Sequence, residues 1–142
     1  MISFGIHQIG EVKIDEDACY IEIHEPYTLG LRHIEKFGHI IVLWWISKRD
    51  NPKDRATMLV TPPRLSEPVE TGVFSSRSPS RPNPIGLTKV KLLKVEKNTL
   101  FVDRIDALDG TPVLDLKPYL PGDSVPLNDI KLPGWFESLR DK

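Results

Sequence analysis

The sequence predicts a mainly β fold: a single antiparallel β-barrel with one short helix and an irregular C-terminal segment. Two observations lead to this prediction. Short alternating or β-branched runs recur between turn signals along the chain, and no strand–helix–strand units repeat among them. With 142 residues, 39% hydrophobic and 27% charged, the chain also has the size and composition of one globular domain spanning residues 1–142.

The first half of the chain has strand patterns on both sides of one helix pattern. Residues 19–24, CYIEIH, alternate with a period of two, as a half-buried strand does. The segment from Pro26 to Gly38 places apolar residues at helical spacing, and its glycines keep the predicted helix short. Residues 40–46, IIVLWWI, lack a polar alternation, which predicts a strand buried on both faces. Residues 57–60 are a shorter strand candidate.

The second half of the chain consists mostly of strand patterns. Val73 and Phe74 begin one strand. Residues 87–97, LTKVKLLKVEK, alternate but change phase at Leu93, which predicts a β-bulge or bend there. A turn then leads to a return strand over residues 100–108, and residues 113–116 add one more short strand. In total we expect six to eight strands, which form a partly or fully closed barrel.

Composition also limits the compartment and the partners. The formal net charge of −1 argues against strong non-specific attraction to nucleic acid, although a local basic surface is compatible with it. Cys19 is the only cysteine, and the start MISFGIHQIG lacks the features of a signal peptide. The longest apolar run is far shorter than the ~20 residues of a membrane-spanning helix. We therefore expect a cytoplasmic protein without a membrane segment. No metal is expected, because the histidines and Cys19 show no metal-ligand spacing.

Residues 72–86, GVFSSRSPSRPNPIG, form an unusual stretch with three prolines, three serines and two arginines. A linker between domains, a Pro-rich recognition segment and a rigid ligand-binding loop are the three interpretations. Neither flanking half has enough strands to bury a core alone, which argues against a linker. The prolines fix φ and favour extended geometry before them, so the segment is stiff. We therefore predict a rigid surface loop that carries Arg77 and Arg81.

This stretch and a second motif, IDALDGTPVLDLKPYLP, together resemble the TsaA/TrmO family, most strongly over residues 27–120. Both motifs are long and stand in the family's order. The resemblance implies an antiparallel β-barrel that forms a homodimer and binds S-adenosylmethionine near the interface. It also implies methylation of N6 of threonylcarbamoyl-adenosine at position 37 of tRNA. The chain has no G-x-G-x-x-G after a strand, so a Rossmann cofactor site is not expected.

The resemblance assigns cofactor contacts to two parts of this sequence. The first motif contributes its first arginine and its closing leucine, and the second contributes its turn. These residues are Arg77, Leu87, Asp109, Gly110, Thr111 and Pro112. From chemistry alone, the planar guanidinium of Arg77 suits either the carboxylate of the cofactor's methionyl end or an RNA phosphate.

Two departures from the family pattern concern the same cofactor. Family members have a His-Gln pair after the buried strand, whereas this sequence has Ser47 and Lys48 there. Members also carry a Ser-Pro-Phe and Pro-Arg-Gln segment after the first strand, and residues 9–19 of this chain have no such segment. Either another part of the chain closes that side of the site, or the ligand or activity differs.

The reaction requires a group that accepts the N6 proton, and the sequence offers two candidates. Asp115 is a carboxylate in the second motif, and Tyr119 offers a phenol whose ring can also stack on a base. Basic residues that could contact an RNA backbone lie in and around both motifs. We select Arg81, Lys89, Lys91 and Lys117.

Other interpretations of the same residues stay open. One is a barrel that binds S-adenosylmethionine or RNA without turnover and has a regulatory role, which the absent N-terminal segment favours. Another is a methyltransferase with a different substrate. A homodimer is expected independently of the family, because Trp44 and Trp45 point to opposite faces of one strand and LPGWF, residues 132–136, adds a second apolar cluster.

Overall fold

The chain divides into two compact units. The computed structural model describes residues 1–63, 65 and 67–139. The first unit comprises Met1–Ser47 and Ile85–Tyr119, and the second comprises Lys48–Pro84 and Leu120–Lys142. The expectation that residues 1–142 act as a single domain stays a prediction.

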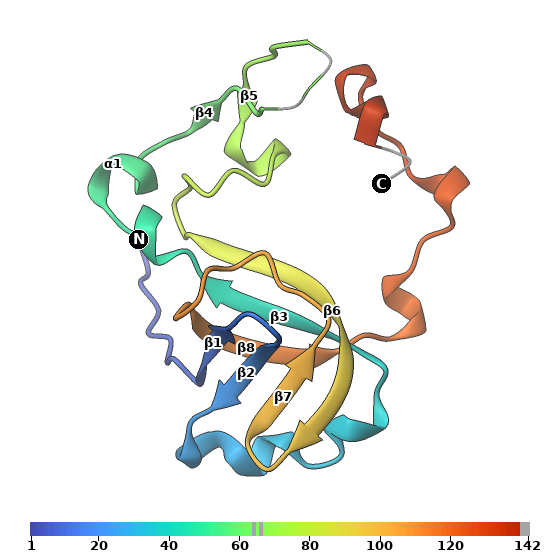
Figure 1. The fold of residues 1–142 in the computed structure, drawn as a ribbon. Coiled ribbons are helices and arrows are strands. Elements are labelled where there is room, and N and C mark those ends of the chain that lie inside the picture. The colour runs from blue at the N-terminus through green and yellow to red at the C-terminus, as the bar shows by residue number, and fades with distance from the viewer. Residues whose placement is uncertain (64, 66, 140–142) are drawn as a thin grey trace. The chain divides into compact units, whose positions relative to one another are not determined.

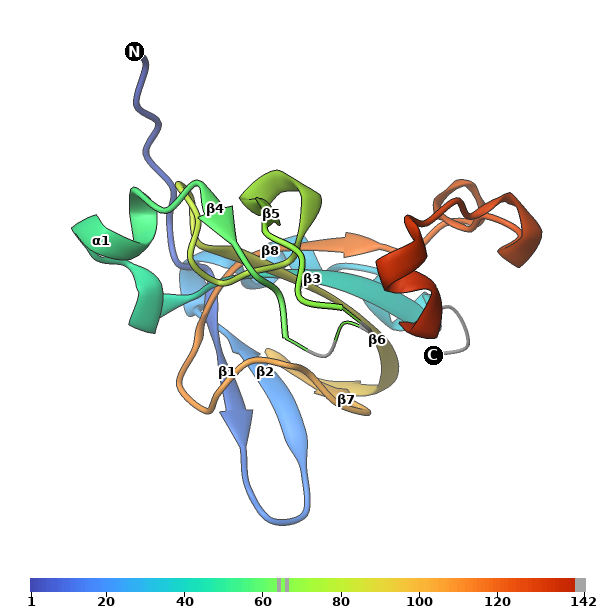
Figure 2. The same cartoon turned by 90° about the horizontal axis from the view of Figure 1, so that it is seen from above.

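The first unit holds six strands and two 3-10 helices. The strands are β1 (Gly10–Ile14), β2 (Cys19–Ile23), β3 (His39–Trp45), β6 (Ile85–Glu96), β7 (Thr99–Val102) and β8 (Pro112–Pro118). The 3-10 helices η1 (Glu25–Leu31) and η2 (Ile34–Lys36) connect β2 to β3. Figure 2 shows the β1–β2 hairpin reaching beyond the neighbouring strands.

The six strands form a closed ring of antiparallel pairs. Their order is β1–β2–β7–β6–β3–β8, and β1 pairs again with β8 (Figure 1). Alternating residues point inward and are buried, as Val12 on β1 and its partner Ile21 on β2 show. The centre of this core is aliphatic: Val12, Ile21, Ile23, Ile40, Val42, Val90, Leu100, Val102 and Val113. The prediction of a mainly β chain with antiparallel pairing is therefore confirmed.

The second unit contains little regular structure. Its described residues include one short α-helix, α1 (Pro52–Arg55), and a small sheet of β4 (Leu59–Val60) and β5 (Thr71–Gly72). Its remaining elements are 3-10 turns: η3 (Ser47–Arg49, which begins at the last residue of the first unit), η4 (Val73–Ser75), η5 (Pro121–Asp123), η6 (Leu127–Asp129) and η7 (Gly134–Leu139). The predicted irregular C-terminal segment is thus confirmed for the residues that the structure describes.

Several predicted elements need correction. The helix expected between Pro26 and Gly38 consists of two 3-10 helices, because His33, with a left-handed φ of 72°, interrupts it. The short α-helix lies instead at α1, where the Asn51 side chain accepts a hydrogen bond from the Asp54 N–H and Pro52 occupies the first turn.

The strand boundaries differ in three places. The return strand predicted over residues 100–108 ends at Val102, because the Asp103 side chain accepts the Lys91 and Arg104 N–H groups and turns the chain. Val73 and Phe74 form the turn η4 rather than a strand. In β3, Ile40 and Val42 are fully buried while the opposite face is half-buried, so burial on both faces was wrong. The bulge predicted at Leu93 is present.

Candidate functional site

The outer face of three neighbouring strands collects most of the predicted site residues of the first unit. Strand β3 lies between β6 and β8 in the ring (Figure 1). Because Ile40 and Val42 point into the core, the alternate residues of β3 point outward, together with their cross-strand partners. Three of the outward rows hold predicted site residues: His39 with Lys91; Ile41 with Lys89 and Lys117; Leu43 with Leu87 and Asp115.

A β-bulge gives Asp115 its outward position. Trp44 on β3 pairs with Val113, whereas the adjacent Leu43 pairs with Asp115, so Leu114 is an extra residue on β8. Val113 is fully buried, and without the extra residue Asp115 would also face the core. The bulge therefore puts a carboxylate in line with Leu43 and the predicted cofactor residue Leu87.

The two candidate proton acceptors occupy opposite ends of this face. Asp115 shares a row with Leu87, so two strand spacings of ~4.8 Å separate their backbones. Tyr119 lies next to His39, since its N–H donates to the His39 carbonyl. Leu43 is four residue steps along β3 from His39, which corresponds to about 13 Å. Position along the sheet therefore favours Asp115 over Tyr119 as the group near Leu87.

The predicted RNA-binding lysines flank both candidates. The Lys117 ammonium is 3.0 Å from the Asp115 carboxylate, in an exposed ion pair. The Lys89 ammonium lies 5.1 Å from the centre of the Tyr119 ring, whose other neighbour is the His39 ring at 6.2 Å. This cluster of His39, Lys89 and Tyr119 combines a stacking surface with positive charge, as single-stranded nucleic acid requires. Sequence reasoning did not select His39, because its place next to Tyr119 depends on strand register.

The turn assigned to the cofactor leads into β8 and is hydrogen-bonded to β1. Its Asp109 side chain accepts the Ile14 N–H at 2.8 Å, and the Gly110 N–H donates to the Val12 carbonyl at 2.7 Å. Gly110 has a φ of 85°, a conformation that favours glycine. Thr111 and Pro112 follow at the start of β8, half-buried. The Asp109 carboxylate is thus used to hold the turn, and the turn's exposed backbone remains for a ligand.

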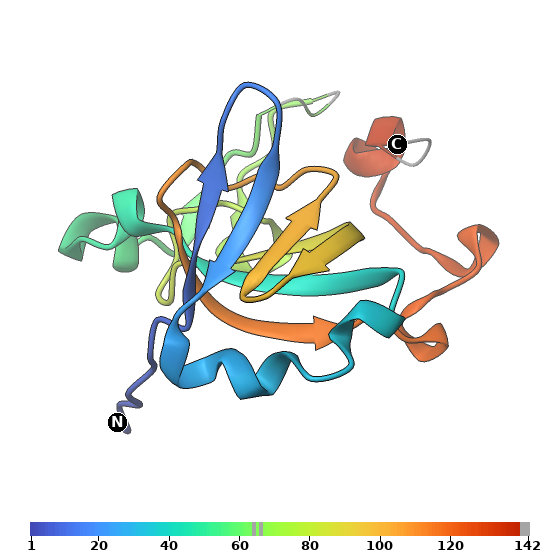
Figure 3. The ribbon, with the colours of Figure 1, turned by 60° about the horizontal axis from the view of Figure 1, so that its bottom comes forward.

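Two cavities of the first unit adjoin Asp115. The larger, about 490 Å³, lies between β8 and the η1–η2 segment, which run side by side in Figure 3. The smaller, about 370 Å³, lies on the outer face at Leu43, Ile85 and Leu114. Ile6 and His7 of the N-terminal segment are also part of its wall. Residues before the first strand therefore contribute to the site of this chain, and the sequence pattern gave no sign of this.

The second unit presents Arg77 at a cavity of its own. Arg77 is exposed and lines a cavity of about 480 Å³ with neighbours that include Pro62, Pro63 and Phe136. Within the described part of the chain, its guanidinium has no hydrogen bond or ion pair. Ser47 and Lys48, at the start of η3, are exposed and do not line this cavity.

Hydrogen bonds hold the loop that carries Arg77. The Arg81 guanidinium donates to the carbonyls of Ser76 and Ser78, at 3.1 and 3.0 Å. The Ser80 hydroxyl donates to the Asp54 carboxylate, and the Arg55 guanidinium donates to the Pro82 carbonyl. These bonds support the loop predicted from the prolines, and its rigidity stays a prediction. Arg81 is half-buried and braces this loop. Its predicted contact with RNA stays a prediction.

Neither a metal centre nor a membrane-spanning helix occurs among the described residues. The described residues contain no group of three or more His, Cys, Asp or Glu side chains placed to hold a metal ion. None of the described helices is long and apolar enough to span a membrane.

The fold and the position of the two motifs agree with one known family. Residues 8–124 match the family model of the tRNA-methyltransferase O N-terminal domain. The chain belongs to this family. The resemblance drawn from residues 27–120 is thereby confirmed, and the match extends it to the N-terminal strand.

Proteins similar to this TrmO-family chain carry two kinds of description. An S-adenosyl-L-methionine-binding protein of Archaeoglobus fulgidus is 52% identical over 109 residues, which cover 77% of this chain and 74% of that protein. The tRNA (adenine(37)-N6)-methyltransferase of Mus musculus is 46% identical over 99 residues, or 70% of this chain. This chain matches only 22% of the mouse protein's length.

The solved structures give the same fold for this TrmO-family chain. The crystal structure of TrmO from Pseudomonas aeruginosa superimposes with a TM-score of 0.69 at 27% identity. The superposition covers 92% of this chain and 61% of that one. A second TrmO crystal structure gives a TM-score of 0.67 at 26% identity. The chain thus spans somewhat less than two thirds of these solved chains.

Proposed function

We propose that this chain is an S-adenosylmethionine-dependent methyltransferase that acts on N6 of adenine 37 in tRNA, with threonylcarbamoyl-adenosine as its substrate. The observation that carries the proposal is the row of Leu87, Leu43 and Asp115. It aligns a cofactor residue of the family motif with a carboxylate that can accept a proton. The descriptions of the archaeal and mouse relatives support the cofactor and the reaction.

The residues present fit this cofactor in chemistry. Arg77, whose guanidinium has no partner among the described residues, can bind a carboxylate, and Leu87 offers exposed apolar surface to a base or ribose. The backbone of the turn at Gly110 is exposed for polar contacts. When bound, S-adenosylmethionine would supply a methyl group already activated by its sulfonium.

The chain's own residues would then align N6 with the methyl group and accept the N6 proton. Held by Arg77, Leu87 and the turn at Gly110, the cofactor would supply its methyl group to N6 and leave as the neutral thioether. Asp115 accepts the N6 proton, and alignment supplies most of the remaining acceleration. Lys117 forms an ion pair with that carboxylate at 3.0 Å. Lys89, Lys91, His39 and Tyr119 would contact the RNA farther along the same face.

One assay tests this function. Purified protein is mixed with labelled S-adenosylmethionine and tRNA that carries, or lacks, the threonylcarbamoyl group. We expect label to enter only the modified tRNA, at position 37. Cofactor binding without any transfer to either tRNA would instead support a non-catalytic S-adenosylmethionine-binding protein, the second candidate, which the description of the Archaeoglobus relative favours.

A further inference from the structure

The two cavities of the first unit share one wall. Ile9, Tyr27 and Asp115 line both the 490 Å³ cavity and the 370 Å³ cavity. A ligand that fills both therefore passes Asp115 at the point where they meet. Each cavity is within the size range of sites for small molecules.

The smaller cavity suits a planar base. Its floor is the outer face of the sheet, where Leu43, Ile85 and Leu114 present apolar side chains. Asp115 offers a carboxylate at the edge, which accepts hydrogen bonds from an N–H group of the base. A largely apolar slot with a carboxylate at its edge matches an adenine whose N6 carries a proton, and His7 and Tyr27 add polar groups to the same wall.

The larger cavity carries a positive charge in addition to the Asp115 carboxylate. Its walls are mostly apolar, and they include Leu31, Phe37 and Leu116. Arg32 is its basic residue, and no hydrogen bond or ion pair of the Arg32 guanidinium occurs among the described residues. The other charge there, Asp115, is paired with Lys117. A free guanidinium beside apolar walls binds a carboxylate in the bidentate manner.

The backbone holds Arg32 at this position. Arg32 ends η1, and its N–H donates to the Leu29 carbonyl at 3.3 Å. His33 follows in the left-handed conformation, with a φ of 72°, and turns the chain into η2. Such a conformation is strained for a non-glycine residue and is retained where the surroundings require it. His33 thus defines the turn that follows Arg32.

We propose that the two cavities together bind an adenine whose N6 substituent ends in a carboxylate, with the base in the smaller cavity and the carboxylate on Arg32. Asp115 at the shared wall then lies next to N6. Arg32 is the residue that selects the acidic substituent. The inference rests on the proposed function for the identity of the substituent, which is threonylcarbamoyl.

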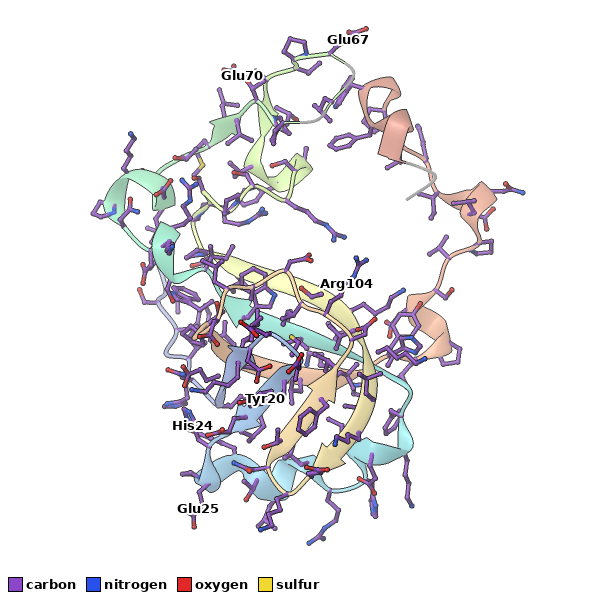
Figure 4. The ribbon with its side chains drawn as sticks, viewed as in Figure 1. Tyr20, His24, Glu25, Glu67, Glu70 and Arg104 are labelled. Carbon is purple, nitrogen blue, oxygen red and sulfur yellow. The ribbon has the colours of Figure 1, made fainter. Side chains whose placement is uncertain are left out.

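The experiment measures binding of the free nucleoside, apart from methyl transfer. Threonylcarbamoyl-adenosine, its neutral methyl ester and adenosine are titrated by calorimetry into the protein saturated with S-adenosylhomocysteine. The variants are Arg32→Gln, Arg32→Lys and, as control, Arg104→Gln. Arg104 is also an exposed arginine of the first unit, but it lines neither cavity and lies away from the start of η1 in Figure 4.

We expect the parent and Arg104→Gln to bind the acid about 10- to 100-fold more tightly than its ester, the effect of one charge-assisted pair. Arg32→Gln should lose this preference, and Arg32→Lys should keep part of it. Equal affinity for acid and ester, a preference unchanged in Arg32→Gln, or no binding at millimolar nucleoside would each overturn the inference. Arg32-dependent binding without label transfer to tRNA would instead count against the proposed function alone.

Discussion

Asp115 shows how one inserted residue can determine the chemistry of a surface. The extra residue Leu114 changes the phase of β8, so that Asp115 leaves the core side and joins Leu43 and Leu87 on the outside. The same bulge adds Leu114 to the wall of the neighbouring cavity. Bulges re-aim side chains in this manner next to many active sites.

Replacing Asp115 tests its role as proton acceptor. Asp115→Asn keeps the shape of the side chain but removes the acceptor charge, so kcat for methyl transfer should fall about 100-fold. Cofactor affinity, measured by calorimetry, should stay within twofold. Asp106→Asn is the matched control, because Asp106 is an exposed carboxylate of the same unit that lines neither cavity. An unchanged kcat in Asp115→Asn would show that another group accepts the proton.

Replacing Arg77 tests the clamp for the cofactor. A lysine retains the charge but cannot form two parallel hydrogen bonds to a carboxylate. Arg77→Lys should therefore weaken binding of S-adenosylmethionine by roughly 1.5–3 kcal/mol, with no change in thermal stability because the side chain is exposed. Arg104→Lys is the control. If Arg77→Lys and the parent bind S-adenosylmethionine equally well in calorimetry, Arg77 does not hold the cofactor.

At the scale of elements, one carboxylate connects the loop of Arg77 to α1. Asp54 accepts hydrogen bonds from the Ser80 hydroxyl and from the Asn51 amide, and Arg49 lies 3.3 Å away. The bond from Ser80, followed by those from Asn51 and Arg49, holds the pKa of the Asp54 carboxyl below its usual range, although partial burial opposes this. Rigidity of residues 76–83 therefore depends on an anion at position 54.

The loop should accordingly loosen in acid. Since the folded pKa of Asp54 is lowered, its stabilising effect is complete at pH values above its ordinary pKa of about 4 and is lost as pH falls through the folded value. The amide signals of Ser78 and Ser80 in NMR spectra should be constant from pH 8 to 5 and shift below about pH 4. Asp54→Asn should show the loosened signals at every pH, and Glu67→Gln should match the parent. A loop unaffected by Asp54→Asn would contradict this dependence.

Packing explains why residue 86, in the first motif, is a glycine. It pairs with Trp44 across β6 and β3, and a Cβ added there would lie 2.4 Å from the indole ring. The indole is also fixed by its N–H bond to the Thr88 hydroxyl at 3.1 Å. Gly86→Ala should therefore destabilise the protein by about 1–3 kcal/mol. Thermal unfolding should show a lower Tm for Gly86→Ala than for Gly38→Ala, where a Cβ meets open space.

Local patterns gave most of the strands but not the arrangement of the site. Alternation located β2, β3 and β6, whereas the five-residue β1 was not recognised. The signal for α1 was present as Asn51-Pro52, a cap followed by a helix-starting proline. Which residues share the row of Asp115 depends on the bulge at Leu114 and on pairing between distant strands. Neither leaves a local signature, so Arg32, His39 and His7 could not be selected from the sequence.

For the whole molecule, the outer face of β6, β3 and β8 is more apolar than a solvent-exposed sheet needs to be. Ile41 and Leu43 are half-buried on it, and Ile85 and Leu87 are 42% and 49% exposed. Lysines border these residues, which is the usual anatomy of an interface with an apolar centre and a charged rim. The LPGWF segment contributes less than expected, because Leu132, Trp135 and Phe136 are already half-buried.

This face leads to the prediction of a homodimer. Two copies related by a two-fold axis would cover the apolar centre twice, since a two-fold contact places the same residues on both sides. Sedimentation at micromolar concentration should give a mass near twice 16.1 kDa. Ile41→Glu puts a charge in the centre of the face and should yield monomers, whereas Ile14→Glu, on the β1–β2 hairpin where Ile14 is 39% exposed, should remain dimeric. A parent protein that sediments as a monomer and still methylates tRNA would show that one chain contains the complete site.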